Sequence, residues 1–186
     1  MEQEDLGLRS VLVMDAKRHR ELFGHTSSTS SFRLWCGMLS PRFAPVLLYR
    51  LAYACQSKGL RIGARFFSML NTLVFGIEIA TQCKIGPGLF FPHTHGTVIG
   101  ALCIGKNAVI YQGVTLGARD LDFTFSELHR PVVGDNAYIG AGAKILGGVR
   151  IGDNVVVGAN SVVLKSVEDN AVMAGVPAKI IKLRDL

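Results

Sequence analysis

Aliphatic side chains recur every six residues in the C-terminal half of the chain. The period runs through Val133, Ile139, Ile145, Ile151, Val157 and Val163, and glycine directly follows the aliphatic residue at Gly134, Gly140, Gly152 and Gly158. A helix has a period near 3.6 and a strand a period of two, so neither explains the pattern. A solenoid does, because each six-residue unit forms one side of a triangular coil and stacks its aliphatic side chain inside.

The same period reaches back to about residue 78, with two interruptions. Six-residue steps connect Ile79, Ile85 and Phe91, and again Val98, Ile104, Ile110 and Leu116. The step between the two sets is seven residues and falls on the segment FPHTHG. The second interruption, GARDLDFTFSELHRP, is about eleven residues too long for one side. We therefore expect a β-helix over 78–186 with an inserted loop at about 117–131, and such insertions often carry function.

Residues 1–77 follow a helical pattern instead. The stretch 8–23 has apolar residues at mixed helical spacing and is followed by GHTSSTSS at 24–31, which predicts a loop. A helix is expected from about Ser40, entered through proline and ended at Gly59. A second helix over 60–75 places apolar residues on one broad face; these are Ile62, Phe66, Phe67, Leu70 and Leu73.

The helical region carries much of the net charge of +6. No acidic residue lies between Glu21 and Glu78, where the chain has Arg33, Arg42, Arg50, Lys58, Arg61 and Arg65. Solenoid ends need a cap, so the helices are expected to cover the open end of the β-helix. A basic and apolar hairpin is also suited to an anionic membrane surface, which leaves a peripheral membrane contact open. Nucleic-acid binding is not expected, since basic and aromatic residues do not interleave over a platform.

Other features of the sequence predict a cytoplasmic protein. No apolar run reaches the roughly 18 residues of a membrane span, and the acidic N-terminus MEQEDLGLRS does not resemble a signal peptide. The four cysteines, Cys36, Cys55, Cys83 and Cys103, have no paired spacing. They are expected to be reduced, and neither a disulfide framework nor a metal site is predicted from them.

Two groups of motifs resemble a known family. GAGAKILGGVRIGDNVVVGANSVVLKSV followed by AGVPAKII resembles the C-terminal part of hexapeptide-repeat acetyltransferases. The run from YRLAYACQSKG through FGIEI, KIGPGL, FFPHTHG and QGVTLG resembles their serine acetyltransferase branch. The resemblance covers about residues 45–186. It implies a left-handed parallel β-helix, a homotrimer, and direct acetyl transfer from acetyl-CoA to a hydroxyl group.

Acetyl transfer to an alcohol requires a base, because an alcohol is a poor nucleophile at neutral pH. Histidine suits this role, since its ordinary pKa is about 6.5. The resemblance matches His93 to the family's catalytic histidine and Glu78 to the carboxylate that orients it. The two are 15 residues apart, close to one coil of about 18, so they are expected to be neighbours on adjacent coils.

The residues expected to contact the acceptor depart from the serine acetyltransferase pattern. His95 and His129 are candidates, and Arg130 takes the position of the family's second active-site histidine, because its Arg-His order is reversed here. Pro92 replaces an aspartate that grips serine in the family. These departures favour a sugar hydroxyl in bacterial exopolysaccharide synthesis, of the colanic acid type, presented by a free or lipid-linked glycan. Serine O-acetylation in cysteine biosynthesis is the alternative.

For the co-substrate, the resemblance implies binding of CoA between neighbouring subunits. The matching positions are Gly117, Ala141 and Ala159, small residues beside the pantetheine arm, and Lys165, Lys179 and Lys182, suited to phosphate. Two other classes remain open. His93, His95 and His129 are enough for a zinc site, although no metal is expected. A non-catalytic trimeric scaffold is the second.

Overall fold

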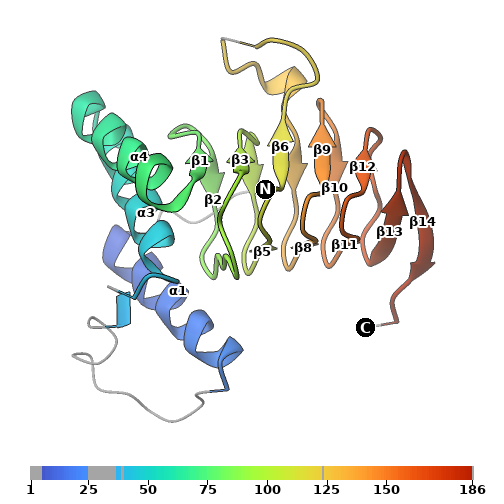
Figure 1. Cartoon of the computed structure of the whole chain (residues 1–186), viewed down its shortest axis with the longest axis horizontal. Coiled ribbons are helices and arrows are strands. Elements are labelled where there is room, and N and C mark those ends of the chain that lie inside the picture. The colour runs from blue at the N-terminus through green and yellow to red at the C-terminus, as the bar shows by residue number, and fades with distance from the viewer. Residues whose placement is uncertain (1–5, 25–36, 39, 123, 186) are drawn as a thin grey trace.

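The chain folds into a left-handed parallel β-helix with helices packed on one end (Figure 1). The computed structural model describes residues 6–24, 37–38, 40–122 and 124–185. The predicted Ser/Thr loop lies outside this range except for Gly24. A long loop projects from the side of the β-helix after β6 (Figure 1). The hairpin of β13 and β14 forms the end of the β-helix that lies opposite the helices (Figure 1).

Three sheets form the sides of the prism, and the chain visits them in the order A, B, C. Sheet A contains β1 (Ile77–Ile79), β3 (Thr97–Ile99), β6 (Thr115–Gly117), β9 (Lys144–Leu146) and β12 (Val162–Val163). Sheet B contains β2 (Lys84–Ile85), β4 (Cys103–Ile104), β7 (Val132–Val133) and β10 (Arg150–Ile151). Sheet C contains β5 (Val109–Ile110), β8 (Tyr138–Ile139), β11 (Val156–Val157), β13 (Ala171–Gly175) and the antiparallel β14 (Ala178–Leu183).

Each sheet buries one column of aliphatic side chains inside the prism. In sheet A the column is Ile79, Ile99, Leu116, Ile145 and Val163, paired in register from coil to coil and all at most 4% exposed. At the corner between sheets B and C, asparagines stack instead. Asn107, Asn136 and Asn154 have φ between 56° and 58°, and each donates a side-chain hydrogen bond to the asparagine of the next coil. Asparagine tolerates this left-handed backbone and satisfies its neighbour.

One predicted core position, in β3, is wrong by one residue. Val98 was the expected core residue of its six-residue unit, but it is 38% exposed, whereas Ile99 is 1% exposed and pairs with Leu116. The chain takes eight residues from Phe90 to Val98 but six between their partners on the next coil, Val109 and Thr115. The two additional residues lie in the FPHTHG segment, and they move the inward position one residue along the chain.

The helices whose bounds the described residues define before the β-helix are α1 (Leu8–Leu22), α3 (Ala44–Ser57) and α4 (Arg61–Phe75). Pro45 lies in the first turn of α3, as the sequence predicts, and α3 ends two residues before Gly59, where φ is +74°. Gly76 ends α4 in the left-handed conformation that favours glycine, and β1 follows at once. Buried residues of α1 and α3 join those of the first coil in one core, so the helices cap the prism.

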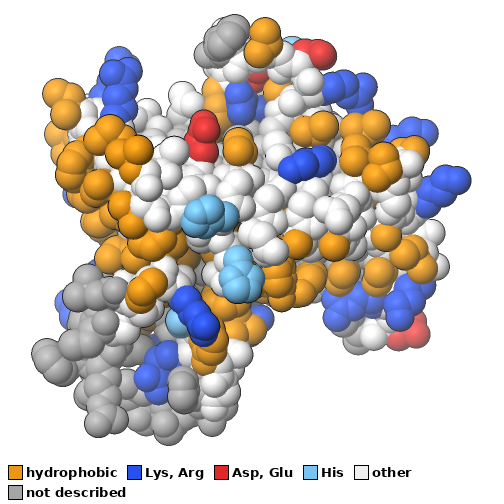
Figure 2. Space-filling model, in the orientation of Figure 1, with side chains coloured by type: hydrophobic (Ala, Val, Ile, Leu, Met, Phe, Trp, Pro, Cys, Tyr) orange, Lys and Arg blue, Asp and Glu red, His pale blue; other side chains and the backbone are white. Residues whose placement is uncertain are grey.

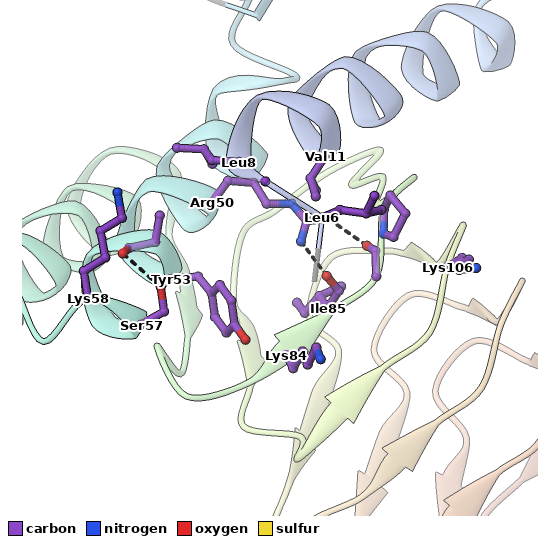
Figure 3. Close-up of a pocket in the computed structure, with 14 residues that line it drawn as sticks. Leu6, Leu8, Val11, Arg50, Tyr53, Ser57, Lys58, Lys84, Ile85 and Lys106 are labelled. Atoms are coloured by element: carbon purple, nitrogen blue, oxygen red, sulfur yellow. Dashed lines mark hydrogen bonds between the residues drawn. The ribbon is translucent and has the colours of Figure 1, made fainter. Parts of the chain in front are cut away.

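A buried ion pair fixes the cap to the first coil. The Arg50 guanidinium donates to both carboxylate oxygens of Asp15, at 2.8 and 3.1 Å. It also donates to the carbonyls of Ile85 and Gly86, which Figure 3 shows. The Asp15 carboxylate also accepts the backbone N–H of Gly88 at 2.7 Å. Both charged side chains are almost completely buried. Because every charge is hydrogen-bonded, the pair holds α1, α3 and the first coil in one arrangement.

Candidate active site

Glu78 lies on the outer face of sheet A. Its neighbours Ile77 and Ile79 point into the core, so the Glu78 side chain projects outward and is exposed. The register continues this outward row through Val98, Thr115, Lys144 and Val162 on successive strands. Lys144 Nζ donates to Thr115 Oγ1 at 3.1 Å and to the Gly113 carbonyl. Sheet A therefore presents a carboxylate in its first strand and an ammonium three strands away.

His93 is exposed at the corner where the chain passes from sheet C to sheet A, here called the C/A corner. Two hydrogen bonds fix its segment to the end of α4: Thr94 Oγ1 donates to the Phe75 carbonyl at 2.8 Å, and Gly96 N donates to the Gly76 carbonyl at 2.9 Å. The additional residues of this coil thus form a supported bulge that presents an imidazole to solvent. Figure 2 shows histidine side chains grouped where the helices meet the β-helix.

Glu78 and His93 both belong to the segments where the C/A corner of the first coil meets the end of α4. Gly76, two residues before Glu78, accepts the hydrogen bond from the His93 segment. Neither a hydrogen bond nor an ion pair joins the two side chains within the described residues. Both are on exposed surface, so side-chain rotation is free to change their separation. The predicted role of Glu78 as the orienting carboxylate stays a prediction.

His95 begins a column of backbone-linked residues along the C/A corner. Gly113 N donates to the His95 carbonyl, Gly142 N to the Gln112 carbonyl and Asn160 N to the Ala141 carbonyl, at 2.8–3.0 Å. The column is therefore His95, Gln112, Ala141 and Ala159, which spans three coils, roughly 14 Å at the spacing of neighbouring strands. The structure thus brings two predicted cofactor positions, Ala141 and Ala159, onto the edge that also carries His93 and His95.

Gln112 lies within this column and was not among the predicted site residues. Its side-chain Oε1 is buried and has no hydrogen-bond partner among the described residues. A buried acceptor without a partner is costly in a folded protein. Gln112 is therefore a further candidate for contact with a bound molecule. The sequence signal for it is its place in QGVTLG, directly before the corner glycine Gly113.

The other edge of sheet A, the A/B corner, carries a second group of predicted residues. Gly117 accepts a hydrogen bond from Gly147 N at 2.9 Å and faces open space. Nearby, a cavity of about 350 Å³ is lined by Arg119, Asp120, His129, Gly147, Gly148, Val149 and Leu164. His129 is exposed in a short 3-10 helix, η1 (Glu127–His129). Gly117 and His129 therefore lie across sheet A from the C/A corner.

Arg130, predicted to contact the acceptor, is held inside the inserted loop. Its Nε donates to the Asp122 carboxylate at 2.9 Å, and its two terminal nitrogens donate to the carbonyls of Gly100 and Asp122. The guanidinium also lies 4.0 Å from the centre of the Phe125 ring, and 13% of the side chain is exposed. These contacts use the guanidinium to close the loop, which leaves little of it for a substrate carboxylate.

Asp122 is the centre of that loop. Desolvation raises the pKa of its carboxyl, but hydrogen bonds from Thr124, Ser126 and Arg130 outweigh this and lower the pKa below its ordinary value. The carboxylate is therefore charged at neutral pH and binds the loop on both sides. No local sequence pattern identifies this role, because the partner that defines it, Arg130, lies eight residues away in an irregular segment.

The three predicted phosphate-binding lysines are exposed but lie on two sides of the prism. Lys165 follows β12 of sheet A, whereas Lys179 and Lys182 belong to β14 of sheet C. Lys179 pairs with Ala174 beside the C/A corner, and Lys182 pairs with Val172 further along the sheet. Lys179 is thus the one of the three that follows the column ending at Ala159. The structure does not gather all three at one point.

A larger cavity, of about 450 Å³, lies elsewhere. It is enclosed by the start of α1, the end of α3 and the B/C corner of the first two coils (Figure 3). Arg50, Tyr53 and Ile85 line its wall, with Lys58, Lys84 and Lys106 around it. None of the predicted site residues lines it. Of the three candidate zinc histidines, His129 lies across sheet A from His93 and His95, and the described residues include no group of three His, Cys, Asp or Glu side chains placed to hold a metal.

Comparison with known proteins identifies the family. The model "Bacterial transferase hexapeptide (six repeats)" matches residues 130–165. A serine acetyltransferase of Staphylococcus aureus (strain Mu50) is 43% identical over 133 residues, which cover 71% of this chain and 61% of that protein. One of Staphylococcus epidermidis (strain RP62A) is 47% identical over 122 residues, covering 65% and 56%. The chain thus spans about three fifths of the length of these relatives.

Solved structures give the same result. A Neisseria gonorrhoeae serine acetyltransferase has a TM-score of 0.79 at 30% identity and covers 95% of this chain and 65% of its own. The soybean apoenzyme has a TM-score of 0.79 at 32% identity and covers 94% and 69%. The fold and its loop-bearing corners define a hexapeptide-repeat transferase. This chain belongs to the hexapeptide-repeat acetyltransferases of the serine acetyltransferase type.

The expected sugar acceptor of exopolysaccharide synthesis is wrong. The relatives at 43–47% identity are serine acetyltransferases, and so are the matching solved structures. A match of 133 residues within 186 must include residues 55–132, and hence Glu78, His93 and the inserted loop. Pro92 and the reversed His129–Arg130 order therefore do not indicate a sugar acceptor. Arg130 is occupied inside the loop, so its position says little about the acceptor.

Proposed function

We propose that this chain is a serine O-acetyltransferase that transfers the acetyl group of acetyl-CoA to the hydroxyl of L-serine. The observation that carries the proposal is the 43% identity to serine acetyltransferases over a segment that must include His93. Among the structural neighbours, one serine acetyltransferase structure is a complex with CoA and another, from Neisseria gonorrhoeae, a complex with serine. The exposed imidazole of His93 on a supported bulge supplies the required base.

In the proposed reaction, His93 accepts the hydroxyl proton of serine while the serine oxygen attacks the thioester carbonyl. The C–O bond forms, the C–S bond breaks, and the imidazolium returns its proton to the departing CoA sulfur. Glu78 turns toward His93 in the loaded site and stabilises the imidazolium, as a carboxylate does in other histidine-dependent acyl transfers. Apo structures often hold such pairs too far apart, and the contact shortens when substrate binds.

Acetyl-CoA is proposed to lie along the C/A corner. Ala141 and Ala159 leave the backbone accessible there, Lys179 follows at the end of the column, and Gln112 offers an unpaired acceptor between the alanines and His95. An extended co-substrate on this edge would bring its thioester to His93. Gly117, His129 and Lys165, across sheet A, fit this path only if a neighbouring subunit faces them.

The partner proposals follow from that geometry. We propose a homotrimer, in which the A/B corner of one subunit approaches the C/A corner of the next and places the two groups of residues on one groove. The membrane contact left open by the sequence concerns α4 and is independent of catalysis. Sedimentation of the purified chain tests the trimer, since a monomer of 20.1 kDa would contradict it.

Release of free thiol from acetyl-CoA tests the reaction directly. With L-serine we expect saturable turnover and a product of the mass of O-acetylserine. The matched acceptors are D-serine, L-alanine and N-acetyl-L-serine, which remove the correct configuration, the hydroxyl or the charged amine in turn. Saturable turnover with a hydroxyl acceptor other than serine, or none by the folded protein, would overturn the proposal. The latter result would leave the scaffold alternative.

A further inference from the structure

The helix α4 is apolar on the face that it turns to solvent. Its buried face carries Ala64 and Asn71, seven residues apart. On the opposite side, at spacings of four, three and four, an apolar stripe is exposed, consisting of Ile62 (87%), Phe66 (50%), Met69 (52%) and Leu73 (73%). A helix at the surface of a soluble domain normally places polar side chains there. Figure 2 shows hydrophobic side chains gathered over the α3–α4 end of the molecule.

Cations that form no ion pair among the described residues border the apolar stripe. Lys58, Arg61 and Arg65 are exposed at the start of α4 and just before it. The sequence has no Asp or Glu between Glu21 and Glu78. A second copy of the chain that paired its own α4 with this one would bring these cations together with nothing of opposite charge in the same segment. A surface that combines anionic head groups with apolar interior complements both features.

We propose that α4 is an interfacial helix that docks the protein on an anionic lipid bilayer. The 15 residues of α4 extend over roughly 22 Å. The apolar stripe enters the boundary between head groups and acyl chains, and the flexible Arg61 and Arg65 side chains reach the phosphates. Among the described residues, no helix is both long and apolar enough to cross a membrane.

Vesicle cosedimentation of the full chain tests this inference. We expect binding to vesicles of phosphatidylcholine with 30% phosphatidylglycerol at low salt, and at least tenfold weaker binding to phosphatidylcholine alone. Binding should fall as salt screens the charges. The double variant Ile62→Ser/Phe66→Ser and the double variant Arg61→Gln/Arg65→Gln should each lose at least tenfold. Leu121→Ser is the matched control, because Leu121 is 88% exposed in the inserted loop, far along the chain from α4.

The same variants separate the inference from its alternatives. If Ile62→Ser/Phe66→Ser changes the oligomeric mass without vesicles, the stripe is an interface between copies and the membrane proposal is overturned. Equal binding by wild type and both double variants overturns it as well. Thiol release measured in parallel should be unchanged in the two α4 variants, since neither site contacts the C/A corner. If the wild type shows no acetyl transfer, the proposed reaction is contradicted, whereas the vesicle-binding result is unaffected.

Discussion

The first coil of the β-helix differs from the coils that follow it in regularity and in the side chains that it exposes. The outward row of sheet A advances by 18 residues from Lys144 to Val162, and the inward column there is unbroken. The first coil has two more residues at the C/A corner than the next coil, and His93 is exposed there. Hydrogen bonds from Arg50 and to the end of α4 hold this coil in place. Regular units stack aliphatic side chains, whereas the departures from regularity present polar side chains to solvent.

The largest expected effect concerns the irregular corner. We expect His93→Ala to lower kcat for serine acetylation by about 10²–10⁴-fold, the range for loss of a general base, while acetyl-CoA binding and the fold are retained. A residue of a regular corner, such as Ala141, has no proton to transfer, so the effect should be confined to the first coil. Steady-state kinetics with calorimetric measurement of CoA binding make the test. Near-normal kcat in His93→Ala would contradict the role of His93 as the base, and the first coil would then have no distinct chemical role.

The anchor of the first coil gives the next effect. Asp15→Ala leaves the Arg50 guanidinium buried without its carboxylate, and removal of one partner of such a pair costs about 3–5 kcal/mol. Urea denaturation should show this loss, and hydrogen exchange should show it in the first coil and α1 before the later coils. Lys17→Ala on the exposed side of α1 is the control and should change the free energy of unfolding by less than about 0.5 kcal/mol. Uniform exchange along the prism would contradict this division.

The two regions also differ in how far the sequence predicted them. The six-residue period identified the inward residues of the later coils, because each position repeats the environment of the one before it. It wrongly predicted Val98 as an inward residue, because two additional residues in the FPHTHG segment interrupt the six-residue period there. Asp15 and Arg50 are 35 residues apart on two helices, so no local pattern joins them. Likewise, hydrophobic spacing found the apolar face of α4 but not that Ile62 and Leu73 are uncovered.

A smaller effect is expected at the orienting carboxylate. Glu78→Gln keeps a hydrogen-bond acceptor but loses the charge that would stabilise an imidazolium, so we expect kcat to fall about 10-fold with little change in KM. Glu78→Asp, which retains the charge, should restore most of the rate. Because no hydrogen bond or ion pair joins the two side chains in the described structure, the variants also test whether one forms on binding. An unchanged kcat in Glu78→Gln would contradict a catalytic role for Glu78 and leave it as an exposed residue of sheet A.

The smallest effect is expected at the inserted loop, the other departure from the regular coil. Asp122→Asn weakens the contacts that hold Arg130, and Arg130→Gln removes them from the other side. If both residues act only by closing the loop, each variant should raise KM for serine a few-fold with little loss of global stability, since the loop lies outside the stacked core. The double variant should then be no worse than either single variant, because residues of one network do not act additively.

The sign of the pH dependence sharpens that test. The folded-state pKa of Asp122 is below its ordinary value, so its contribution to loop closure is complete above about 3.9, the ordinary pKa of aspartate. This contribution is lost as pH falls through the folded value. Exchange of the loop amides of Thr124 and Ser126, whose hydrogen-bond acceptor is Asp122, should therefore accelerate relative to the prism only under strongly acidic conditions. A serine clamp at Arg130 would give another outcome: Arg130→Gln would abolish serine binding, Asp122→Asn would not, and the two effects would add.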